Sequence, residues 1–227
     1  MLPQPPTDRV YSLWRNVTMY SQYEEERFIL EALKDIPQGR LLDLGASMPT
    51  KFSNSRRLIE LGWEAVLVDC SPDAIKALAT EYAGVWPRVK VVQAAIVPEH
   101  ANDGELVDIN LTEDFVTTFD QATFDKWKGQ VPYYGRMSAV PCSLSDLAKR
   151  LRGPPPGTTR FDFINIDLEG QSVDVFLDLF EAIWVSAPNP TCICVEYDDR
   201  IKDVMRAADR HGYDVRCKNG TNVVLAR

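Results

Sequence analysis

Residues 40–47, RLLDLGAS, decide the fold: a short, largely apolar run holds Asp43 beside its end and meets a glycine. An apolar run of this length, bounded by Gly45, is typical of a strand that a parallel sheet buries on both faces. Residues 65–69, AVLVD, repeat the pattern, and the Ser71-Pro72 pair behind them predicts a helix that begins with a serine cap. Because strands and helices alternate in this way, the sequence predicts an α/β fold.

Further strands and helices continue this alternation to the end of the chain. Three more buried strands are predicted over residues 88–96, 161–167 and 191–196, and amphipathic helices over residues 29–36, 173–184 and 201–208. Two β-rich runs follow, 213–217 and 222–226, and the Asn219-Gly220 pair between them is a strong hairpin signal. We therefore predict a single domain over residues 1–227, with an open, mostly parallel central sheet, helices on both faces and a C-terminal antiparallel hairpin.

Two segments depart from the alternation. Residues 1–38 are predicted to form an N-terminal helical cap, and residues 101–140 an insertion that shapes an acceptor site as a lid. The insertion is rich in aromatic side chains, namely Phe115, Phe119, Phe124, Trp127, Tyr133 and Tyr134. These rings can floor a pocket, or they can form the buried face of an additional helix, which is the commoner arrangement.

Composition and charge exclude several classes of protein. The chain has 227 residues, of which 45% are hydrophobic, enough for a sizeable core and too many for a disordered chain. It carries 33 acidic against 25 basic residues, a net charge of −8, which argues against nucleic acid or an anionic membrane as a partner. Its five cysteines match no zinc-binding spacing. Because neither a long apolar run nor an N-terminal signal sequence is seen, we expect a cytoplasmic protein.

The turn after the first strand bears on the kind of ligand. A dinucleotide-binding turn needs three glycines, because backbone amides must approach a pyrophosphate closely. Here Gly45 is the one glycine of the turn, and Met48-Pro49 follows where such a turn would continue. The sequence therefore disfavours a nicotinamide-dependent oxidoreductase and fits a ligand without phosphate, such as S-adenosylmethionine.

Asp69 ends the second strand, where nucleoside-binding α/β proteins commonly hold an acidic residue against the ribose. A carboxylate can accept hydrogen bonds from both ribose hydroxyls at once. The alternative is that Asp69 caps the following helix, but Ser71 is better placed for that role. We therefore interpret Asp69 as the ribose ligand.

Four segments carry a resemblance to a known family. They are SQYEEERFIL at residues 21–30, LDLGAS at 42–47 with FSNS at 52–55, GWEAVLVD at 62–69, and FINIDLEG at 163–170. Together they resemble the FkbM-type methyltransferases, with their Ser-Asn pair and Asp-x-Glu-Gly block. The likeness extends, with gaps, from about residue 21 to the C-terminus, while Glu24 and Met48-Pro49 depart from the family pattern.

The resemblance implies a Rossmann-like class I methyltransferase that uses S-adenosylmethionine and methylates an oxygen of a small-molecule acceptor, such as a sugar or polyketide. By position, the implied cofactor-binding residues are Gln22, Asp43, Gly45, Ala46, Ser47, Ser53, Asn54, Asp69, Cys70, Ser71, Ala94, Ala95 and Asp167. In this interpretation the turn after Asp43 holds the methionine part, and Ala94 and Ala95 lie against the adenine. The oligomeric state stays open.

Asp167 and Glu169 are the candidate catalytic residues. An acidic residue at the end of the fourth strand faces the transferred methyl group in this fold, and a neighbouring carboxylate raises its pKa toward that of a useful base. The pair could also hold a divalent cation such as Mg²⁺, together with Glu196 or Asp198. Alternatively, Glu169 caps the helix that begins near Ser172.

His100, which follows the third strand, is a second candidate for the base. A different class of function is also open, because the same fold can serve as a non-catalytic module that binds a partner protein. That alternative predicts a closed cavity, or an apolar surface patch over residues 110–138.

Overall fold

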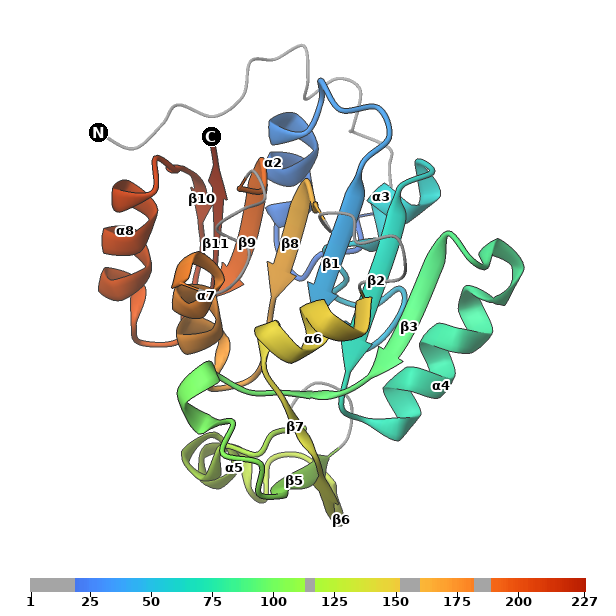
Figure 1. Ribbon diagram of the computed structural model, residues 1–227, viewed down its shortest axis with the longest axis vertical. Coiled ribbons are helices and arrows are strands. Elements are labelled where there is room, and N and C mark those ends of the chain that lie inside the picture. The colour runs from blue at the N-terminus through green and yellow to red at the C-terminus, as the bar shows by residue number, and fades with distance from the viewer. Residues whose placement is uncertain (1–18, 113–116, 152–159, 182–188) are drawn as a thin grey trace.

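A seven-stranded sheet forms the centre of the molecule (Figure 1). The computed structural model describes residues 19–112, 117–151, 160–181 and 189–227. In spatial order the sheet contains β10 (Asp214–Lys218), β11 (Asn222–Ala226), β9 (Cys192–Glu196), β8 (Phe163–Ile166), β1 (Arg40–Leu44), β2 (Glu64–Asp69) and β3 (Val89–Gln93). The strands from β9 to β3 run parallel, and β11 runs antiparallel to both β9 and β10. The predicted, mostly parallel sheet with a C-terminal hairpin is confirmed.

Helices cover both faces of the sheet, because successive strand residues point to opposite faces. On one face, Leu42 and its neighbours pack with α6 (Leu144–Leu151), α7 (Ser172–Glu181) and α8 (Ile201–Arg210). On the other face, Leu41 and its neighbours pack with α2 (Glu25–Ala32), α3 (Arg56–Glu60) and α4 (Pro72–Glu81). Figure 1 shows α6 and α7 in front of the sheet. The two apolar layers fix the positions of the parallel strands. They leave the edge of the sheet at the carboxyl ends of these strands available for a site.

The strand predicted over residues 88–96 is divided in two. β3 ends at Gln93, and the amide of Ala94 donates to the carbonyl of Asp69 at 2.9 Å. The next two residues form a separate strand, β4 (Ala95–Ile96), which pairs in parallel with β7 (Pro141–Cys142). The chain leaves the main sheet at this point because a segment beyond the insertion offers its backbone a new partner.

The insertion lies at the carboxyl ends of the parallel strands, at the bottom of Figure 1. It contains β5 (Val107–Thr112), α5 (Gln121–Trp127) and β6 (Tyr133–Ala139), and β5 pairs antiparallel with β6. Phe124 of α5 is buried and packs on the ring of Tyr133 of β6, with centroids 5.2 Å apart, whereas Tyr134 is exposed. The aromatic residues thus do not share the face of one helix, and Phe115 lies outside the described residues.

The predicted N-terminal cap is described from residue 19 onward, and residues 1–18 lie outside the described part. Here α2 is fixed to the C-terminal hairpin: the buried carboxylate of Glu25 accepts from the side-chain amides of Asn219 and Asn222, at 2.7 and 2.9 Å. Across the described ranges, no helix is both long and apolar enough to cross a membrane.

Candidate functional site

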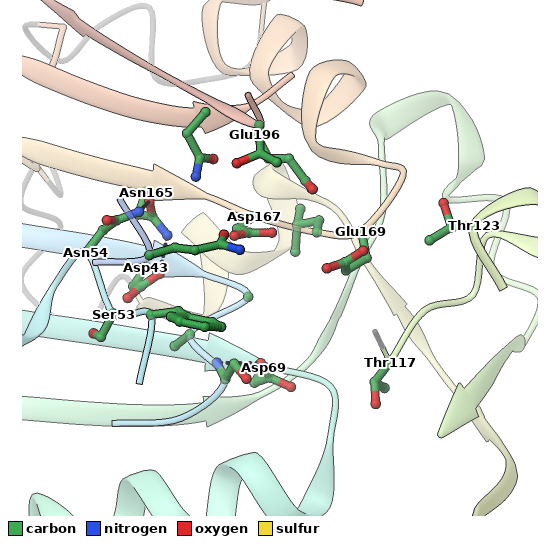
Figure 2. Close-up of a pocket in the computed structure, with 18 of the residues that line it drawn as sticks. Asp43, Ser53, Asn54, Asp69, Thr117, Thr123, Asn165, Asp167, Glu169 and Glu196 are labelled. Atoms are coloured by element: carbon green, nitrogen blue, oxygen red, sulfur yellow. Dashed lines mark hydrogen bonds between the residues drawn. The ribbon is translucent and has the colours of Figure 1, made fainter. Parts of the chain in front are cut away.

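A cavity of about 570 Å³ opens at the carboxyl ends of the central strands (Figure 2). Ligands of open α/β sheets bind at this edge, beside the strand where the order of the sheet reverses. That strand is β1, since the chain proceeds to β2 and β3 on one side and to β8 and β9 on the other. The position and the volume are those of a small-molecule site.

The turn after β1 borders the cavity and requires glycine at position 45. Gly45 has a φ of 81°, and a Cβ atom there would overlap the carbonyl oxygen of Asp167. The amides of Gly45 and Ala46 both donate to one carbonyl of β2, at 2.9 and 3.0 Å, and the amide of Ser47 donates to Asp69 Oδ2 at 2.9 Å. Three consecutive amides are thus used within the protein, which agrees with the prediction that this turn does not bind a phosphate.

Asp69, the predicted ribose ligand, lies in the cavity lining and is hydrogen-bonded to both the turn after β1 and the start of α4. Its Oδ2 accepts from the amide of Ser47, and its Oδ1 accepts from the amide of Ser71 at 2.7 Å. Ser71 caps α4 as predicted, because its hydroxyl accepts from the amide of Ala74 at 3.4 Å. Burial raises the pKa of Asp69, and the hydrogen bonds from the backbone amides oppose that rise. Each carboxylate oxygen keeps a further lone pair for a ligand hydroxyl.

Three polar side chains form a buried chain beside the turn. Asn54 Nδ2 donates to Asn165 Oδ1 at 3.0 Å, and Asn165 Nδ2 donates to Asp43 Oδ1 at 2.9 Å. All three residues line the cavity, and none is more than 6% exposed. Burial raises the pKa of Asp43, while hydrogen bonds from Ser55 and Asn165 lower it. Asn165 was not among the predicted site residues, although a side-chain amide inside the buried strand FINI is a signal that points to it.

Two buried polar atoms at this end of the cavity lack a partner among the described residues. They are the hydroxyl oxygen of Ser47 and Oδ1 of Asn54. A buried polar atom without a hydrogen bond costs about 1–3 kcal/mol, and in native proteins such atoms are usually satisfied by a ligand, an ion or water. The cavity therefore offers hydrogen bonds that the described protein atoms do not use.

The other end of the cavity is acidic. Carboxylate oxygens of Asp167, Glu169 and Glu196, the acidic group, lie within 4.8 Å of one another (Figure 2). Burial raises the pKa of Asp167 to about 8, and the charge of Glu169 adds to the rise. Burial and the charge of Glu196 raise the pKa of Glu169 to about 8, and the pKa of Glu196 moves in the same direction. At neutral pH the acidic group therefore retains protons that isolated carboxyls would have lost.

The acidic group bears on two of the alternatives drawn from the sequence. The loop into α7 is tied by Ser172, whose hydroxyl accepts from the amide of Leu168 at 2.8 Å and donates to Glu196 at 3.1 Å. Glu169 instead places its carboxylate in the cavity lining, beside Asp167. Carboxylate oxygens are the ligands that Mg²⁺ and Ca²⁺ prefer, so the acidic group contains the residues that could hold such a cation.

The insertion forms the remaining wall of the cavity. The hydroxyl of Thr118 donates to the carbonyl of Glu169 at 2.8 Å, and a Cβ atom on Gly170 would lie only 2.6 Å from Thr123 Oγ1. Lining residues from the insertion include Thr117, Thr123, Lys126, Trp127 and Val131. Figure 2 shows Thr117 and Thr123 beyond Glu169, on the side away from Asn54. The insertion therefore borders the acidic end of the cavity.

Backbone strain concentrates around the cavity. Among the described residues other than glycine, four have a positive φ: Ser47, Phe52, Glu169 and Asp198, at 44°, 59°, 44° and 45°. All four line the cavity. Left-handed conformations of such residues cost about 1–3 kcal/mol each and cluster at functional sites. Their distribution supports this cavity as the functional site.

Most of the predicted site residues meet here. The cavity lining contains Gln22, Asp43, Gly45, Ala46, Ser47, Ser53, Asn54, Asp69, Cys70, Ser71, Ala94, Asp167 and Glu169. Ala95 is buried outside the lining, because side chains alternate along a strand and its neighbours Ala94 and Ile96 face the cavity.

His100 is the predicted base that the structure does not bring to the cavity. It lies exposed on the 3-10 turn η2 (Glu99–Ala101). Glu99 anchors that turn: its amide donates to Asp178 of α7 at 2.7 Å, and its carboxylate accepts from the amide of Ser145 of α6 at 2.9 Å. These bonds hold η2 against two helices and leave His100 at the surface. Trp127, one of the aromatic side chains that the sequence offered for the floor of a pocket, lines the cavity, and so does Lys126, to which no sequence pattern pointed.

Comparisons with known proteins concern the fold. No protein-family model and no curated protein matches the chain. The C-terminal domain of precorrin-6Y C5,15-methyltransferase from Rhodobacter capsulatus is similar at 14% identity and a TM-score of 0.44, over 88% of this chain and 86% of that one. Precorrin-6y C5,15-methyltransferase from Geobacter metallireducens is similar at 13% identity and a TM-score of 0.45, over 93% of this chain and 91% of that one. An O-methyltransferase from Bacillus cereus in complex with SAH is similar at 12% identity and a TM-score of 0.44, over 98% of this chain and 92% of that one.

The order of the seven strands identifies the fold. Parallel strands diverge from β1 in both directions, and the C-terminal hairpin closes one side with an antiparallel strand between β9 and β10. This is the Rossmann-like architecture, mostly parallel with a C-terminal antiparallel hairpin, that the sequence predicts.

Proposed function

We propose that the chain is an S-adenosylmethionine-dependent methyltransferase that methylates a hydroxyl oxygen of a small-molecule acceptor, such as a sugar or a polyketide. One observation carries the proposal. At the edge where the sheet reverses, the cavity offers acceptors from Asp69, Asp43 and Asn54, while the amides that could bind a phosphate are already used. Such a site suits adenosine joined to an amino acid through a cationic sulfur. The resemblance to the FkbM-type methyltransferases adds support from the sequence.

In this proposal, different lining residues hold different parts of the ligand. Asp69 would accept from the ribose hydroxyls, and the small side chain of Ala94 would lie beside the adenine. Asp43 and Asn54 would accept from the ammonium of the methionine end. Asp167, at the carboxyl end of β8, would then face the sulfur.

S-adenosylmethionine supplies, when bound, a methyl group on a positively charged sulfur, which is the leaving group when an acceptor oxygen attacks the methyl carbon. The part of this chain is to hold the acceptor in line and to take its proton, and positioning is the larger contribution. Asp167 suits the second task, because burial and Glu169 bring its pKa to about 8, close to the value of an effective general base.

The acceptor is proposed to lie against the insertion. Trp127 offers an aromatic face, over which the ammonium of Lys126 lies 5.5 Å from the ring centroid. Thr117 and Thr123 offer hydroxyl groups nearby. An apolar face with a few polar groups is the usual composition of a site for small molecules with hydroxyl groups. Sugars are therefore the first acceptors to test.

Calorimetric titration with S-adenosylhomocysteine tests the proposal. We expect micromolar binding of this ligand and no binding of NADH, since the amides of Gly45, Ala46 and Ser47 already have partners within the protein. An unaltered protein that does not bind S-adenosylhomocysteine would contradict the proposal and favour a non-catalytic binding module. Heat from Mg²⁺ that appears only with S-adenosylhomocysteine present would identify the acidic group as metal ligands, and binding would then be followed by assays of methyl transfer to sugars and polyketides.

A further inference from the structure

Asn165 links two residues of the proposed cofactor site. Asp43 and Asn165 are direct neighbours across the parallel strands β1 and β8, so their side chains leave the sheet on the same face. The surrounding layer is apolar and includes Leu41 and Phe163. A buried amide in such a layer needs hydrogen bonds, and Asn165 makes them to Asp43 on one side and to Asn54 on the other.

These bonds leave one arrangement of the two amides. An ionised carboxylate can only accept, so Asn165 must turn its NH₂ group toward Asp43. Its oxygen then faces Asn54, which must in turn donate its own NH₂ group. The oxygen of Asn54 is what remains, and it has no partner among the described residues although the residue is only 6% exposed.

The free oxygen of Asn54 selects a ligand group that donates. Asn54 and Asp43 line the same end of the cavity, so two acceptors lie there together. A ligand carboxylate only accepts hydrogen bonds, so it could bond to neither acceptor. An ammonium group would donate to both. The charge of Asp43 also polarises the amides that follow it, which strengthens the last acceptor of the chain.

We propose that Asn165 is a positioning residue that fixes the side chain of Asn54, so that its oxygen accepts from the ammonium group of the bound cofactor. This inference rests on the proposed function, because it takes the amino-acid end of S-adenosylmethionine as the donor. Asn165 acts through Asn54. Without Asn165, the side-chain amide of Asn54 keeps only the long bond from Nδ2 to Cys194 Sγ, at 3.5 Å. The amide can then turn, so that its NH₂ group faces the ammonium instead.

The test compares two ligands that differ at the amino-acid end. S-adenosylhomocysteine carries the ammonium group, and 5′-methylthioadenosine has the adenosine and the sulfur without the amino acid. We expect Asn165→Leu, which has a similar volume and no hydrogen-bonding atoms, to weaken S-adenosylhomocysteine about tenfold or more. The affinity for 5′-methylthioadenosine should stay within about twofold. A purely structural role would weaken both ligands alike.

Asn110→Leu is the matched control. Asn110 is also a buried asparagine, its side chain accepts from Arg136 Nε at 3.2 Å, and it lies on β5 outside the cavity lining. This substitution should leave the ratio of the two affinities unchanged. In an Asn54→Ala background, Asn165→Leu should add less than about twofold, because a residue that acts through Asn54 has nothing left to position.

The outcomes distinguish a failure of the proposed function from a failure of the positioning role. An unaltered protein that binds neither ligand contradicts the proposed function itself. If it binds both, the positioning role is overturned when Asn165→Leu weakens both ligands equally or neither, or when its effect persists in full without the Asn54 side chain. If thermal melting shows that Asn165→Leu does not fold, Asn165→Ala is measured with the same expectations, since the smaller side chain introduces no overlap.

Discussion

Asp69 joins the turn after β1 to the end of β2, because its Oδ2 accepts from the backbone amide of Ser47 at 2.9 Å. The bond holds Ser47 in a left-handed conformation, with a φ of 44°. The other carboxylate oxygen of Asp69 accepts from the amide that begins the cap of α4. The shape of this end of the cavity therefore depends on one side chain.

We predict that Asp69→Ala weakens S-adenosylhomocysteine and 5′-methylthioadenosine alike, by about 10- to 100-fold, because both ligands lose the acceptor for the ribose. Titration calorimetry measures both affinities. Glu64→Ala, at the exposed start of the same strand, is the control and should change neither. Unchanged affinities in Asp69→Ala would refute the ribose assignment.

Replacing the proposed base should slow the reaction without loss of the cofactor. We expect Asp167→Asn to lower kcat by about 10²- to 10⁴-fold, the usual contribution of a general base, and to change the Kd of S-adenosylhomocysteine by less than about threefold. Asp73→Asn, on the exposed first turn of α4, controls for the change in net charge. A kcat within a few-fold of the unaltered enzyme would assign the proton to another group.

The rate of methyl transfer should rise with pH and level off above about 8, since Asp167 must be ionised to accept a proton and burial raises its pKa to about 8. Glu169→Gln removes the neighbouring negative charge that contributes to this rise, so the midpoint of the profile should move to lower pH. The measurement is kcat against pH for both proteins. A midpoint that stays in place, or moves upward, argues against the coupling of the two carboxyls.

The same carboxyls should make the folded protein less stable as pH increases. Asp167 and Glu169 bind protons more tightly in the folded state, at pKa values of about 8, than in the unfolded chain, where about 4 is usual. Their contribution is complete below the unfolded value and is lost as pH rises through the folded value. Glu169→Gln should therefore raise the free energy of unfolding near pH 8 by about 1 kcal/mol or more, and much less near pH 5. Denaturant titrations at both pH values decide this, and an equal gain at both would contradict it.

Gly45→Ala should be among the most damaging substitutions in the chain. The added methyl group would overlap the carbonyl oxygen of Asp167, and the φ of 81° disfavours any side chain, so we expect a loss above about 4 kcal/mol or no folded protein. Gly84→Ala is the matched control, because nothing lies within 4 Å of its added methyl group, and its melting temperature should stay close to that of the unaltered chain. A folded, stable Gly45→Ala protein would show that the turn can move away from β8.

Local patterns were sufficient to predict the sheet and the turn. β1 and β2 lie where short apolar runs carry an acidic residue at or beside their end, and Ser71 caps α4 as the Ser71-Pro72 pair indicated. The turn at Gly45 and the hairpin at Asn219-Gly220 depend on a few adjacent residues. In these places the information needed for the structure lies within about one turn or one strand of the chain, so it can be recognised without knowledge of the rest.

Pairings between distant segments could not be predicted in the same way. Asn165 reaches Asp43 only because β1 and β8 pair in this register, although the two residues are 122 positions apart. The predicted third strand is broken at Ala94 because β4 finds a partner in β7, beyond the insertion. His100 follows the third strand in sequence, but the bonds of Glu99 to α6 and α7 turn it to the surface. Each of these outcomes depends on a contact that no local pattern contains.

The acidic group has a consequence for the catalytic cycle under the proposed function. The methyl donor is a cation and the demethylated product is neutral, so the charge beside Asp167, Glu169 and Glu196 falls by one when the methyl group leaves. A cation lowers the pKa of carboxyls around it, and its disappearance raises their pKa again, so donor binding releases protons and product formation takes them back. The cavity therefore distinguishes donor from product by charge, and its preference for the donor over the product increases as pH rises and the carboxyls ionise. The acidic group, which attracts the cationic methyl donor, thereby also favours release of the demethylated product.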